Sequence, residues 1–152
     1  MELRNKVVLV TGGGTGIGRA TCLALASRGA TVAVNYSRSK AEAEETVQAI
    51  RQAGGLAFAV RADVSNDGEV REMVAGIVRE CGTVDALVNN AGITRHLPFD
   101  DLEAADGEIW DELYNVNVKG MFFCARAVAP YMRENRQGAI VNVGSIAGVR
   151  GV

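Results

Sequence analysis

The stretch that decides the fold is Thr-Gly-Gly-Gly-Thr-Gly-Ile-Gly at residues 11–18. It follows the apolar run Val7–Val10 and precedes a stretch at 19–28 that is compatible with a helix. A strand, a glycine turn and a helix start in this order are typical of a loop that holds the phosphates of a nucleotide. Glycines let backbone N–H groups approach an anion, and the new helix adds the positive end of its dipole.

The spacing of the glycines narrows this interpretation. Gly12, Gly16 and Gly18 give G-x-x-x-G-x-G, whereas the commoner G-x-G-x-x-G fails at Ile17 and Thr21. A mononucleotide phosphate loop is also excluded, because Arg and Ala follow the last glycine instead of Lys and Ser or Thr. For the glycines alone, a turn without a ligand stays the alternative.

Length and composition predict one soluble domain, since 152 residues with 48% hydrophobic and 22% charged side chains can bury a substantial core. The net charge of -2 lacks the basic excess of a nucleic-acid-binding protein. No apolar run approaches the roughly 20 residues of a membrane span, and residues 1–6 carry no secretion signal. Cys22, Cys81 and Cys124 lack metal-ligand spacing and are typical of buried small side chains in a reducing compartment. We therefore expect a cytoplasmic protein with no metal, membrane or nucleic-acid partner.

Apolar runs alternate with helical patterns along the whole chain. The runs are nearly continuous in apolar residues, as in strands that are covered on both faces. Gly29, Gly54-Gly55 and Gly82 follow the predicted helices, in agreement with left-handed C-terminal caps. The order predicts a single α/β domain over 1–152, a doubly wound parallel sheet with flanking helices and right-handed crossovers. The predicted strands are 7–10, 31–35, 57–61, 86–89 and 139–143.

The end of the second predicted strand decides which dinucleotide is favoured. A carboxylate there would bind the adenosine ribose of NAD and repel a 2′-phosphate. The segment Asn35-Tyr36-Ser37-Arg38-Ser39 contains no acid, and Arg38 with Ser37 could hold a phosphate through charge-assisted hydrogen bonds. We therefore expect NADP(H), with NAD(H) as the alternative, unless Arg38 is only a solvated cation near a helix start. The missing acid also argues against a methyltransferase.

Polar residues end the third and fourth predicted strands, at Asp63-Val64 and Asn89-Asn90-Ala91-Gly92. Both segments fall at the carboxyl edge of the sheet, where open α/β sheets bind ligands. A buried Asn amide can bridge neighbouring backbones, and Ala-Gly lets a flat ligand pass close. Considered singly, Asp63 would be a turn residue or a helix cap and Asn89-Asn90 a turn. Their common place at the strand ends favours the site.

Residues 109–133 are predicted to form one long helix whose charges lie in a narrow stripe. Glu112, Lys119, Arg126 and Arg133 recur every seven residues, and nearly every other position is apolar. One contact with the sheet cannot cover so wide an apolar surface. We therefore expect burial on two sides, against the sheet and against a partner subunit or further chain, which predicts a homo-oligomer through the 109–133 helix.

Two polar residues and one histidine near the carboxyl edge are candidates for catalysis. Asn117 lies on the apolar surface of the long helix, where it either ties the helix to a neighbouring backbone or holds a water in an active site. Ser145 follows the fifth predicted strand, where its hydroxyl suits hydrogen bonding to a substrate carbonyl oxygen, with plain strand termination as the alternative. The nucleophile pattern G-x-S-x-G is absent, because Val143 stands two residues before Ser145. His96, the only histidine, is interpreted as a solvated loop residue rather than a base.

Together these residues resemble the short-chain dehydrogenase/reductase family, and especially its 3-oxoacyl-[acyl-carrier-protein] reductase-like members. The resemblance extends over the whole chain and implies a Rossmann-like fold. In the family the glycine motif holds the cofactor pyrophosphate, the aspartate after the third strand contacts adenine, and the Asn-Asn-Ala-Gly segment supports the central strand and the cofactor. The features that stand in the family's order are Thr11-Gly12-x-x-x-Gly16-Ile17-Gly18, Asp63-Val64, Asn89-Asn90-Ala91-Gly92, Asn117 and Ser145.

The resemblance also assigns site residues. It places Asn117 at a proton-relay water and Ser145 at the substrate carbonyl, so these two are the expected catalytic residues. The residues expected to bind the cofactor are Gly12, Thr15, Gly16, Ile17, Gly18, Asn35, Tyr36, Ser37, Arg38, Asp63, Val64, Asn90, Ala91 and Gly92.

The reaction that the resemblance implies is hydride transfer between the nicotinamide C4 and a carbonyl or secondary-alcohol carbon. A 3-oxoacyl group on an acyl carrier protein, and so fatty acid biosynthesis, is one candidate. The family's general acid is a Tyr beyond the serine, whose pKa is lowered by a Lys one helical turn later. Both positions fall after Val152, and neither Tyr114 nor Tyr131 precedes a Lys at the required spacing. We therefore expect a truncated chain that lacks the C-terminal part of the fold and is inactive alone.

Three hypotheses from different classes stay open. The chain is part of an NADP-dependent oxidoreductase, or a nucleotide-binding module without turnover, or an interaction-prone fragment whose fifth strand and long helix seek a partner. Arg133 and Arg136 could attract an acidic acyl carrier protein, although exposed arginines also serve solubility alone.

Overall fold

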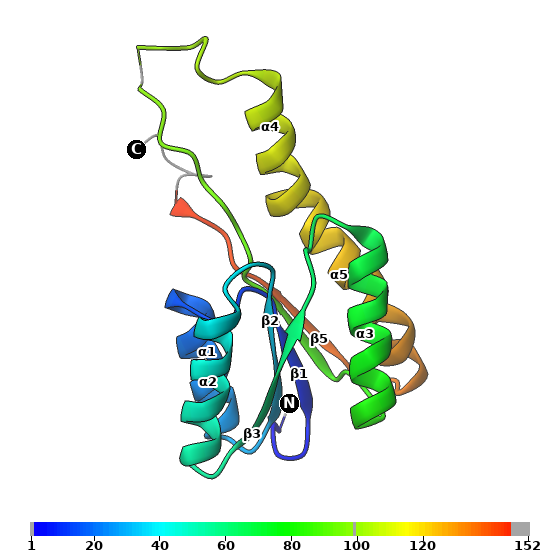
Figure 1. Cartoon of the computed structure of the whole chain (residues 1–152). Helices are drawn as coiled ribbons and strands as arrows, with labels where there is room; N and C mark the ends of the chain where they lie inside the picture. Colours follow the sequence, from blue (N-terminus) through cyan, green and yellow to red (C-terminus); the bar gives the residue numbers. More distant parts are fainter. Residues whose placement is uncertain (1, 99, 147–152) are drawn as a thin grey trace.

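A parallel sheet of five strands forms the centre of the structure, a computed structural model that describes residues 2–98 and 100–146 (Figure 1). The strand order is β3-β2-β1-β4-β5, so the chain moves outward from β1 to one edge and then returns to fill the other side. This is a doubly wound, Rossmann-like sheet, and the predicted fold class is confirmed. Each predicted strand agrees with the structure to within one residue at either end. The strands are β1 Val7–Val10, β2 Thr31–Tyr36, β3 Leu56–Arg61, β4 Ala86–Asn89 and β5 Ala139–Asn142.

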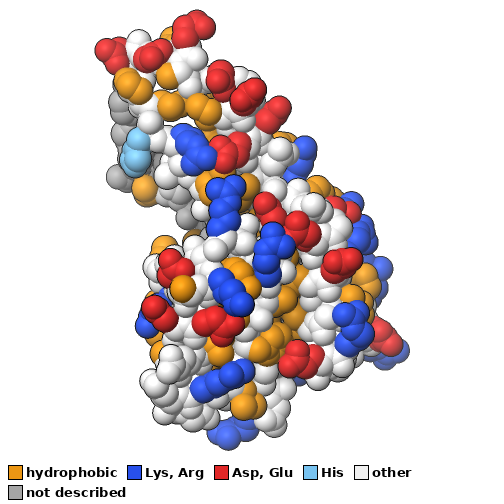
Figure 2. Space-filling model, in the orientation of Figure 1, with side chains coloured by type: hydrophobic (Ala, Val, Ile, Leu, Met, Phe, Trp, Pro, Cys, Tyr) orange, Lys and Arg blue, Asp and Glu red, His pale blue; other side chains and the backbone are white. Residues whose placement is uncertain are grey.

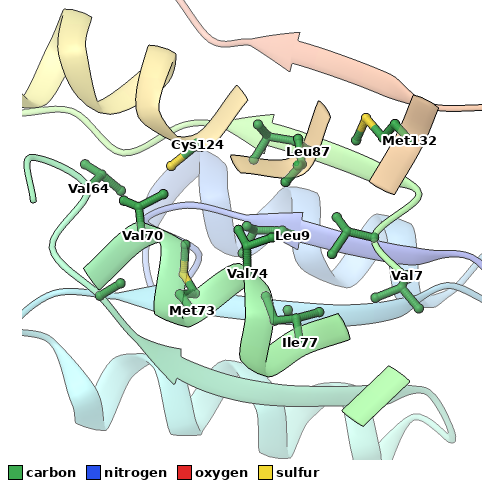
Figure 3. Packing of buried hydrophobic residues seen from close by; sticks show 14 residues of the cluster. Val7, Leu9, Val64, Val70, Met73, Val74, Ile77, Leu87, Cys124 and Met132 are labelled. Atoms are coloured by element: carbon green, nitrogen blue, oxygen red, sulfur yellow. The ribbon is translucent and has the colours of Figure 1, made fainter. Parts of the chain in front are cut away.

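Helices cover both faces of the sheet, with α1 and α2 on one face and α3 and α5 on the other (Figure 1). Alternate residues of β1 serve two cores, because successive side chains of a strand point to opposite faces. Val8 packs with the first helix pair, and Leu9 packs with the second, beside Leu87 and Val74 (Figure 3). The α-helices are α1 Gly16–Ala26, α2 Lys40–Gln52, α3 Asp67–Cys81, α4 Gly107–Tyr114 and α5 Gly120–Glu134.

The glycines predicted to end the first three helices do so. Gly29, Gly54 and Gly82 have φ angles of 86°, 82° and 80°, in the left-handed region that favours glycine. These stops return the chain to the amino edge of the sheet, from which the next strand starts. The segments that leave the strands therefore all lie at the opposite, carboxyl edge.

The prediction of one regular helix over 109–133 is wrong in its middle. The helical run extends from Gly107 to Glu134, but Asn115–Lys119 forms a π-helical turn between α4 and α5, closed by a hydrogen bond from the Gly120 N–H to the Asn115 carbonyl. A π turn accommodates one extra residue, which shifts the phase of all residues after it. The turn contains Asn117, whose side chain is bound to a neighbouring segment.

The apolar surface of this helical run divides into a buried and an exposed row. Cys124, Val128 and Met132 of α5 are buried in the core beside α3. Trp110, Tyr114, Val118 and Phe122, four residues apart, are between 48% and 66% exposed. The helical run is thus buried on one side, against the sheet and α3, as predicted. The side that carries Trp110, Tyr114, Val118 and Phe122 is exposed to solvent in the single chain.

An ion-pair cluster attaches α5 to the start of α3. The Arg126 Nη2 lies 2.7 Å from the Asp67 Oδ1, and the Arg71 Nε lies 2.9 Å from the Asp67 Oδ2. Hydrogen bonds from Arg71 and Arg126 hold the pKa of the Asp67 carboxyl below its usual range. The Arg126 guanidinium also stacks on Phe122 and Phe123, 5.1 and 5.3 Å from the ring centres.

The cysteines behave mainly as the composition predicted. Burial raises the pKa of the Cys22 and Cys124 thiols to about 12, so both stay protonated. Cys81 is partly exposed, and desolvation followed by the Glu80 charge raises the pKa of its thiol. Among residues 2–98 and 100–146, no cluster of metal-ligating side chains occurs. None of the helices in these ranges is long and apolar enough to span a membrane.

Asp85 joins three strands at the amino edge of the sheet. Its buried carboxylate accepts hydrogen bonds from the Val7 N–H at 2.9 Å and from the Lys6 Nζ at 3.3 Å, and its carbonyl accepts from the Ala139 N–H at 3.2 Å. The Asp85 side chain is 7% exposed and that of Lys6 25%. One buried residue therefore holds β1, β4 and β5 in place at the edge away from the ligand side.

We expect Asp85→Ala to lower the free energy of unfolding by about 3 kcal/mol, because it leaves the buried Val7 N–H without its acceptor and the Lys6 ammonium without its counter-charge. The measurement is urea denaturation followed by circular dichroism. Glu45→Gln, which removes the exposed pair between Arg19 and Glu45, is the control and should cost less than about 0.5 kcal/mol. If Asp85→Ala lowered the free energy of unfolding no more than the control does, Asp85 would not be the residue that joins β1, β4 and β5.

Candidate cofactor-binding site

A cavity of about 490 Å³ opens at the carboxyl edge of the sheet, beside the ends of β1, β2, β3 and β4. The segments that follow these four strands line it, together with Glu112 and Val116 of the long helical run. The cavity thus lies at the edge that the strand ends predicted. The predicted residues that line it are Gly12, Thr15, Gly16, Ile17, Asn35, Tyr36, Ser37, Arg38, Asp63, Val64, Asn90, Ala91 and Gly92.

Glycine is needed for a different physical reason at each of the three positions of the motif. Gly12 has a φ of 62°, and a Cβ on it would lie 3.1 Å from the Ala91 Cα. Gly16 has a φ of 51° with open space around it, so its need for glycine is conformational. Gly18 lies beneath the loop, where a Cβ would overlap the Gly12 carbonyl and the Asn90 amide. Gly12 and Gly18 therefore let the loop pack closely against the segment after β4.

The Asn-Asn-Ala-Gly segment bridges neighbouring backbones, as predicted for a buried amide. The Thr11 hydroxyl accepts hydrogen bonds from the Asn90 and Ala91 N–H groups at 2.9 and 3.0 Å. The Asn90 Nδ2 donates in return to the Thr11 and Gly12 carbonyls at 3.0 and 3.1 Å. The Asn89 Nδ2 donates to the Met121 carbonyl at 3.2 Å and so reaches α5. These bonds fix the glycine loop to β4.

The N-terminus of α1 borders the cavity without a side-chain cap. Thr15, its N-cap residue, is extended and makes no capping hydrogen bond, whereas Asn66 and Asp106 accept from the first turns of α3 and α4. Uncapped first-turn N–H groups at a helix start bind anions readily. With the glycine bend beside them, these groups fit the pyrophosphate of a dinucleotide.

The end of β2 presents one cation and no acid to the cavity. Arg38 is exposed there beside Ser37 and Ser39. The acids among the described residues of the lining are Asp63 and Glu112, and Glu112 forms an ion pair with Arg95. The end of β2 thus offers a phosphate one guanidinium and two hydroxyl groups, and no carboxylate of its own.

Asp63 is both a turn residue and part of the cavity wall, the two alternatives that the sequence left open. Its Oδ1 accepts from the Ser65 N–H at 2.9 Å and from the Ser65 hydroxyl at 2.7 Å, which makes it a turn residue. It also lines the cavity, and the Glu69 carboxylate holds its N–H at 3.0 Å. The turn therefore presents Asp63 at the site with a fixed orientation.

Asn117 ties its helix to a neighbouring backbone, which is the first of the two predicted alternatives. Its Nδ2 donates to the Ile93 carbonyl and its Oδ1 accepts from the Ile93 N–H, both at 2.9 Å. Asn117 and Ser145 are not among the described residues that line the cavity, although Ile93 and Val116 are. Ser145 is exposed beyond the end of β5, at the same edge of the sheet.

Several residues at the site were not predicted from the sequence. Arg95 and Glu112 join the segment after β4 to α4, and both line the cavity. The Thr46 hydroxyl of α2 donates to the Gly14 carbonyl at 3.1 Å and holds the middle of the glycine loop. Each contact pairs residues far apart in the chain, so periodicity and motif spacing do not reveal it.

One tyrosine does precede a lysine at the family's spacing, a match that the sequence interpretation overlooked. Tyr36 ends β2 and Lys40 begins α2. In the sheet, β1 and β4 stand between β2 and β5, so this pair lies on the far side of the site from Ser145. Tyr36 and Lys40 therefore cannot act together with Ser145.

Arg133 and Arg136 lie away from the cavity. Arg133 belongs to the last turn of α5, and Arg136 precedes β5. Both are thus at the amino edge of the parallel sheet, opposite to the cavity. A carrier protein attracted there would not present its acyl group to the site of the same chain.

Comparison with known proteins identifies the family of the chain. The family model described as short chain dehydrogenase matches residues 6–152. The chain is 62% identical over 109 residues to the short-chain dehydrogenase/reductase homolog YusS of Bacillus subtilis, covering 72% of this chain and 100% of that protein. It is 45% identical over 147 residues to the 3-oxoacyl-[acyl-carrier-protein] reductase FabG of Staphylococcus epidermidis, covering 97% of this chain. The chain spans 59% of the length of that reductase.

Solved structures share the fold over nearly the whole chain. A putative short-chain dehydrogenase/reductase from Burkholderia xenovorans superposes with a TM-score of 0.91 at 35% identity, covering 98% of this chain and 60% of the other. A metagenomic short-chain oxidoreductase solved in complex with NADP gives 0.91 at 33% identity, covering 100% and 67%. The cavity, the glycine loop and these matches together lead to one conclusion. The chain belongs to the short-chain dehydrogenase/reductase family of oxidoreductases, whose fold binds a nicotinamide cofactor.

Proposed function

We propose that this chain binds NADP(H) in preference to NAD(H), as the cofactor-binding part of an enzyme that transfers hydride between nicotinamide and a carbonyl or secondary alcohol. The observation that carries the proposal is the uncapped start of α1 beside the glycine bend, with Arg38 and no acid at the end of β2. The NADP bound to the metagenomic relative supports the choice of cofactor class.

The residues present fit such a dinucleotide. A Cβ on Gly12 would press against Ala91 and Asn90, so glycine there lets the loop pack on the segment after β4, whereas Gly16 has open space around it in the cavity wall, where a ligand can approach the backbone. The first turn of α1 would hold the pyrophosphate, and Ser37 with Arg38 would hold a 2′-phosphate through charge-assisted hydrogen bonds. Asp63 and Val64 would border the adenine. When bound, the cofactor supplies a hydride donor or acceptor at its nicotinamide ring.

On the substrate side, the family's pattern suggests roles for Ser145 and Asn117. The Ser145 hydroxyl would donate a hydrogen bond to the substrate carbonyl oxygen, and Asn117 would keep the adjoining π turn in place through Ile93. In the family a tyrosine moves the proton, helped by a lysine, at positions that follow residue 152. We therefore propose that this chain alone binds cofactor without turnover.

The first substrate to test is a carrier-free 3-oxoacyl thioester, in view of the names of the relatives. Acidic side chains gather over the end of the molecule formed by loop 100–106 and α4 (Figure 2). An acidic carrier protein would be repelled by this surface. Other carbonyls and secondary alcohols stay open, and we propose a cytoplasmic location.

Arg38→Ala should weaken NADPH binding about tenfold and leave NADH binding unchanged, because only NADPH offers a phosphate to the guanidinium. Dissociation constants for both cofactors come from the fluorescence of the reduced nicotinamide. Arg28→Ala, which removes an exposed arginine outside the cavity lining, is the matched control. An equal loss for both cofactors, or no loss, would argue against the NADP preference.

With the 3-oxoacyl thioester present, we expect the 152-residue chain to bind NADPH but not to oxidise it. The reason is that the tyrosine and lysine that move the proton in the family stand at positions after residue 152. Absorbance of NADPH is followed with and without the thioester, and Ser145→Ala serves as the blank. Oxidation of NADPH that needs the thioester and disappears in Ser145→Ala would overturn the proposed inactivity.

We also propose that copies of the chain associate through the exposed row Trp110, Tyr114, Val118 and Phe122. Large apolar side chains repeating every four residues on one helical face are typical of an interface.

Replacing both Trp110 and Phe122 by Lys should weaken association about a hundredfold, since burying each large apolar side chain contributes about 1.5 to 3 kcal/mol. The mass in solution is measured by light scattering over a range of concentrations. Leu56→Lys, which changes an equally exposed apolar residue on β3, is the control. A monomeric wild-type chain at all concentrations would refute the interface.

A further inference from the structure

We propose that Asn35 is a positioning residue, whose side chain sets the conformation of the glycine loop and does not contact the cofactor. The position of Asn35 at the end of β2 predicted a direct cofactor contact, and the geometry favours a different role. The inference rests on the proposed function, because it concerns how the loop receives a dinucleotide.

The Asn35 side chain is committed to backbone groups on both sides of β2. Asn35 borders the cavity, yet the residue is 1% exposed, so almost none of its side chain is open to a ligand. Its Oδ1 accepts from the Gly12 N–H at 3.3 Å. Its Nδ2 donates to the Ala62 carbonyl at 3.1 Å and to the Val60 and Tyr36 carbonyls at 3.4 Å. A primary amide has two N–H donors, and here both are turned toward carbonyls of the protein.

These bonds decide which way the bend of the glycine loop faces. Gly12 is held on its N–H by Asn35 and on its carbonyl by Asn90, at 3.1 Å. The Gly13 N–H donates to the main-chain carbonyl of Asn35 at 2.9 Å. The first two glycine N–H groups are therefore turned toward β2. The groups left for an anion are at the start of α1, where the cavity lies.

The same side chain connects the loop to the adenine side of the site. Ala62, which accepts from the Asn35 Nδ2, directly precedes Asp63 and Val64 in the cavity wall. One buried amide thus joins the segments after β1 and β3 across β2. A side chain turned into the cavity would leave the Gly12 N–H and the Ala62 carbonyl without this partner, which buried polar groups avoid.

The two roles of Asn35 predict different losses in Asn35→Ala. A positioning role weakens the binding of NADPH about tenfold, mainly through the pyrophosphate loop, and weakens the binding of adenosine 2′-monophosphate clearly less, because that ligand has no pyrophosphate and meets only the Ala62–Val64 side of the site. If Asn35 instead contacts the adenosine ribose directly, Asn35→Ala weakens the binding of both ligands by the same factor. Dissociation constants are measured by fluorescence for NADPH and by calorimetry for adenosine 2′-monophosphate, on the full 152-residue chain.

A loss of stability alone must be distinguished from a change in the loop. Val47→Ala removes buried volume from α2 in the core on the same side and is the matched control. It should lower the melting temperature while NADPH affinity stays unchanged. If Asn35→Ala does not fold, the same measurements are made on Asn35→Ser, which keeps a small polar group at this position.

Amide hydrogen exchange tests the same inference without any cofactor. The Gly12 N–H, bound to the Asn35 side chain, should exchange about tenfold faster in the variant. The Gly13 N–H, bound to the Asn35 main chain, should keep its rate. Equal losses for both ligands, an unchanged NADPH affinity, or equal exchange at both glycines would overturn the inference. If the wild-type chain binds no NADPH, the proposed function fails, and the exchange rates still decide the role of Asn35.

Discussion

The hydrogen bonds between Thr11 and Asn90 are the constraint on which the site depends. They join the ends of β1 and β4 at the point where the strand order reverses, and the Asn90 amide also holds the Gly12 carbonyl. Because the glycines of the loop have no side chains to hold them, their conformation depends on such contacts with neighbouring segments. Gly18 must lack a side chain for the helix to start this close to the loop. The carboxyl edge is therefore rigid on the protein side and open toward the cavity.

The long helical run depends on this edge in a second way. Asn117 binds the Ile93 backbone directly after the Asn-Asn-Ala-Gly segment, and the π turn gives it the geometry to do so. A Cβ on Gly120, which closes the turn, would lie 2.9 Å from a Val64 methyl group, so the turn also packs against the end of β3. The turn that carries Asn117 is thus joined to the segments after both β3 and β4. The exposed aromatic row beyond it is the surface that these contacts leave uncovered.

Much of this could be predicted from the residues because it depends on local patterns. The apolar runs gave strands correct to within one residue, and the glycine spacing placed the cavity. The π turn was missed because it occurs together with a contact between Asn117 and Ile93, which lie far apart in the chain, and a helical pattern contains no sign of such a contact. The pair of Arg95 and Glu112 and the contact of Thr46 with Gly14 were missed for the same reason. Tyr36 and Lys40 show the reverse error, since a spacing that matches the family lies where it cannot serve Ser145.

The sequence by itself determined the fold class, the family and the edge of the sheet that holds the site. Strand periodicity, helix stops and glycine spacing are properties of neighbouring residues, so they are present before the chain folds. Only the tertiary structure decided which polar side chains face the cavity and which are used up by the protein. Asn35 stands at the predicted position, yet its amide is directed to Gly12 and Ala62, because both are brought beside it only when β1 and β3 pair with β2. The direction of a buried side chain is set by the partners that folding supplies.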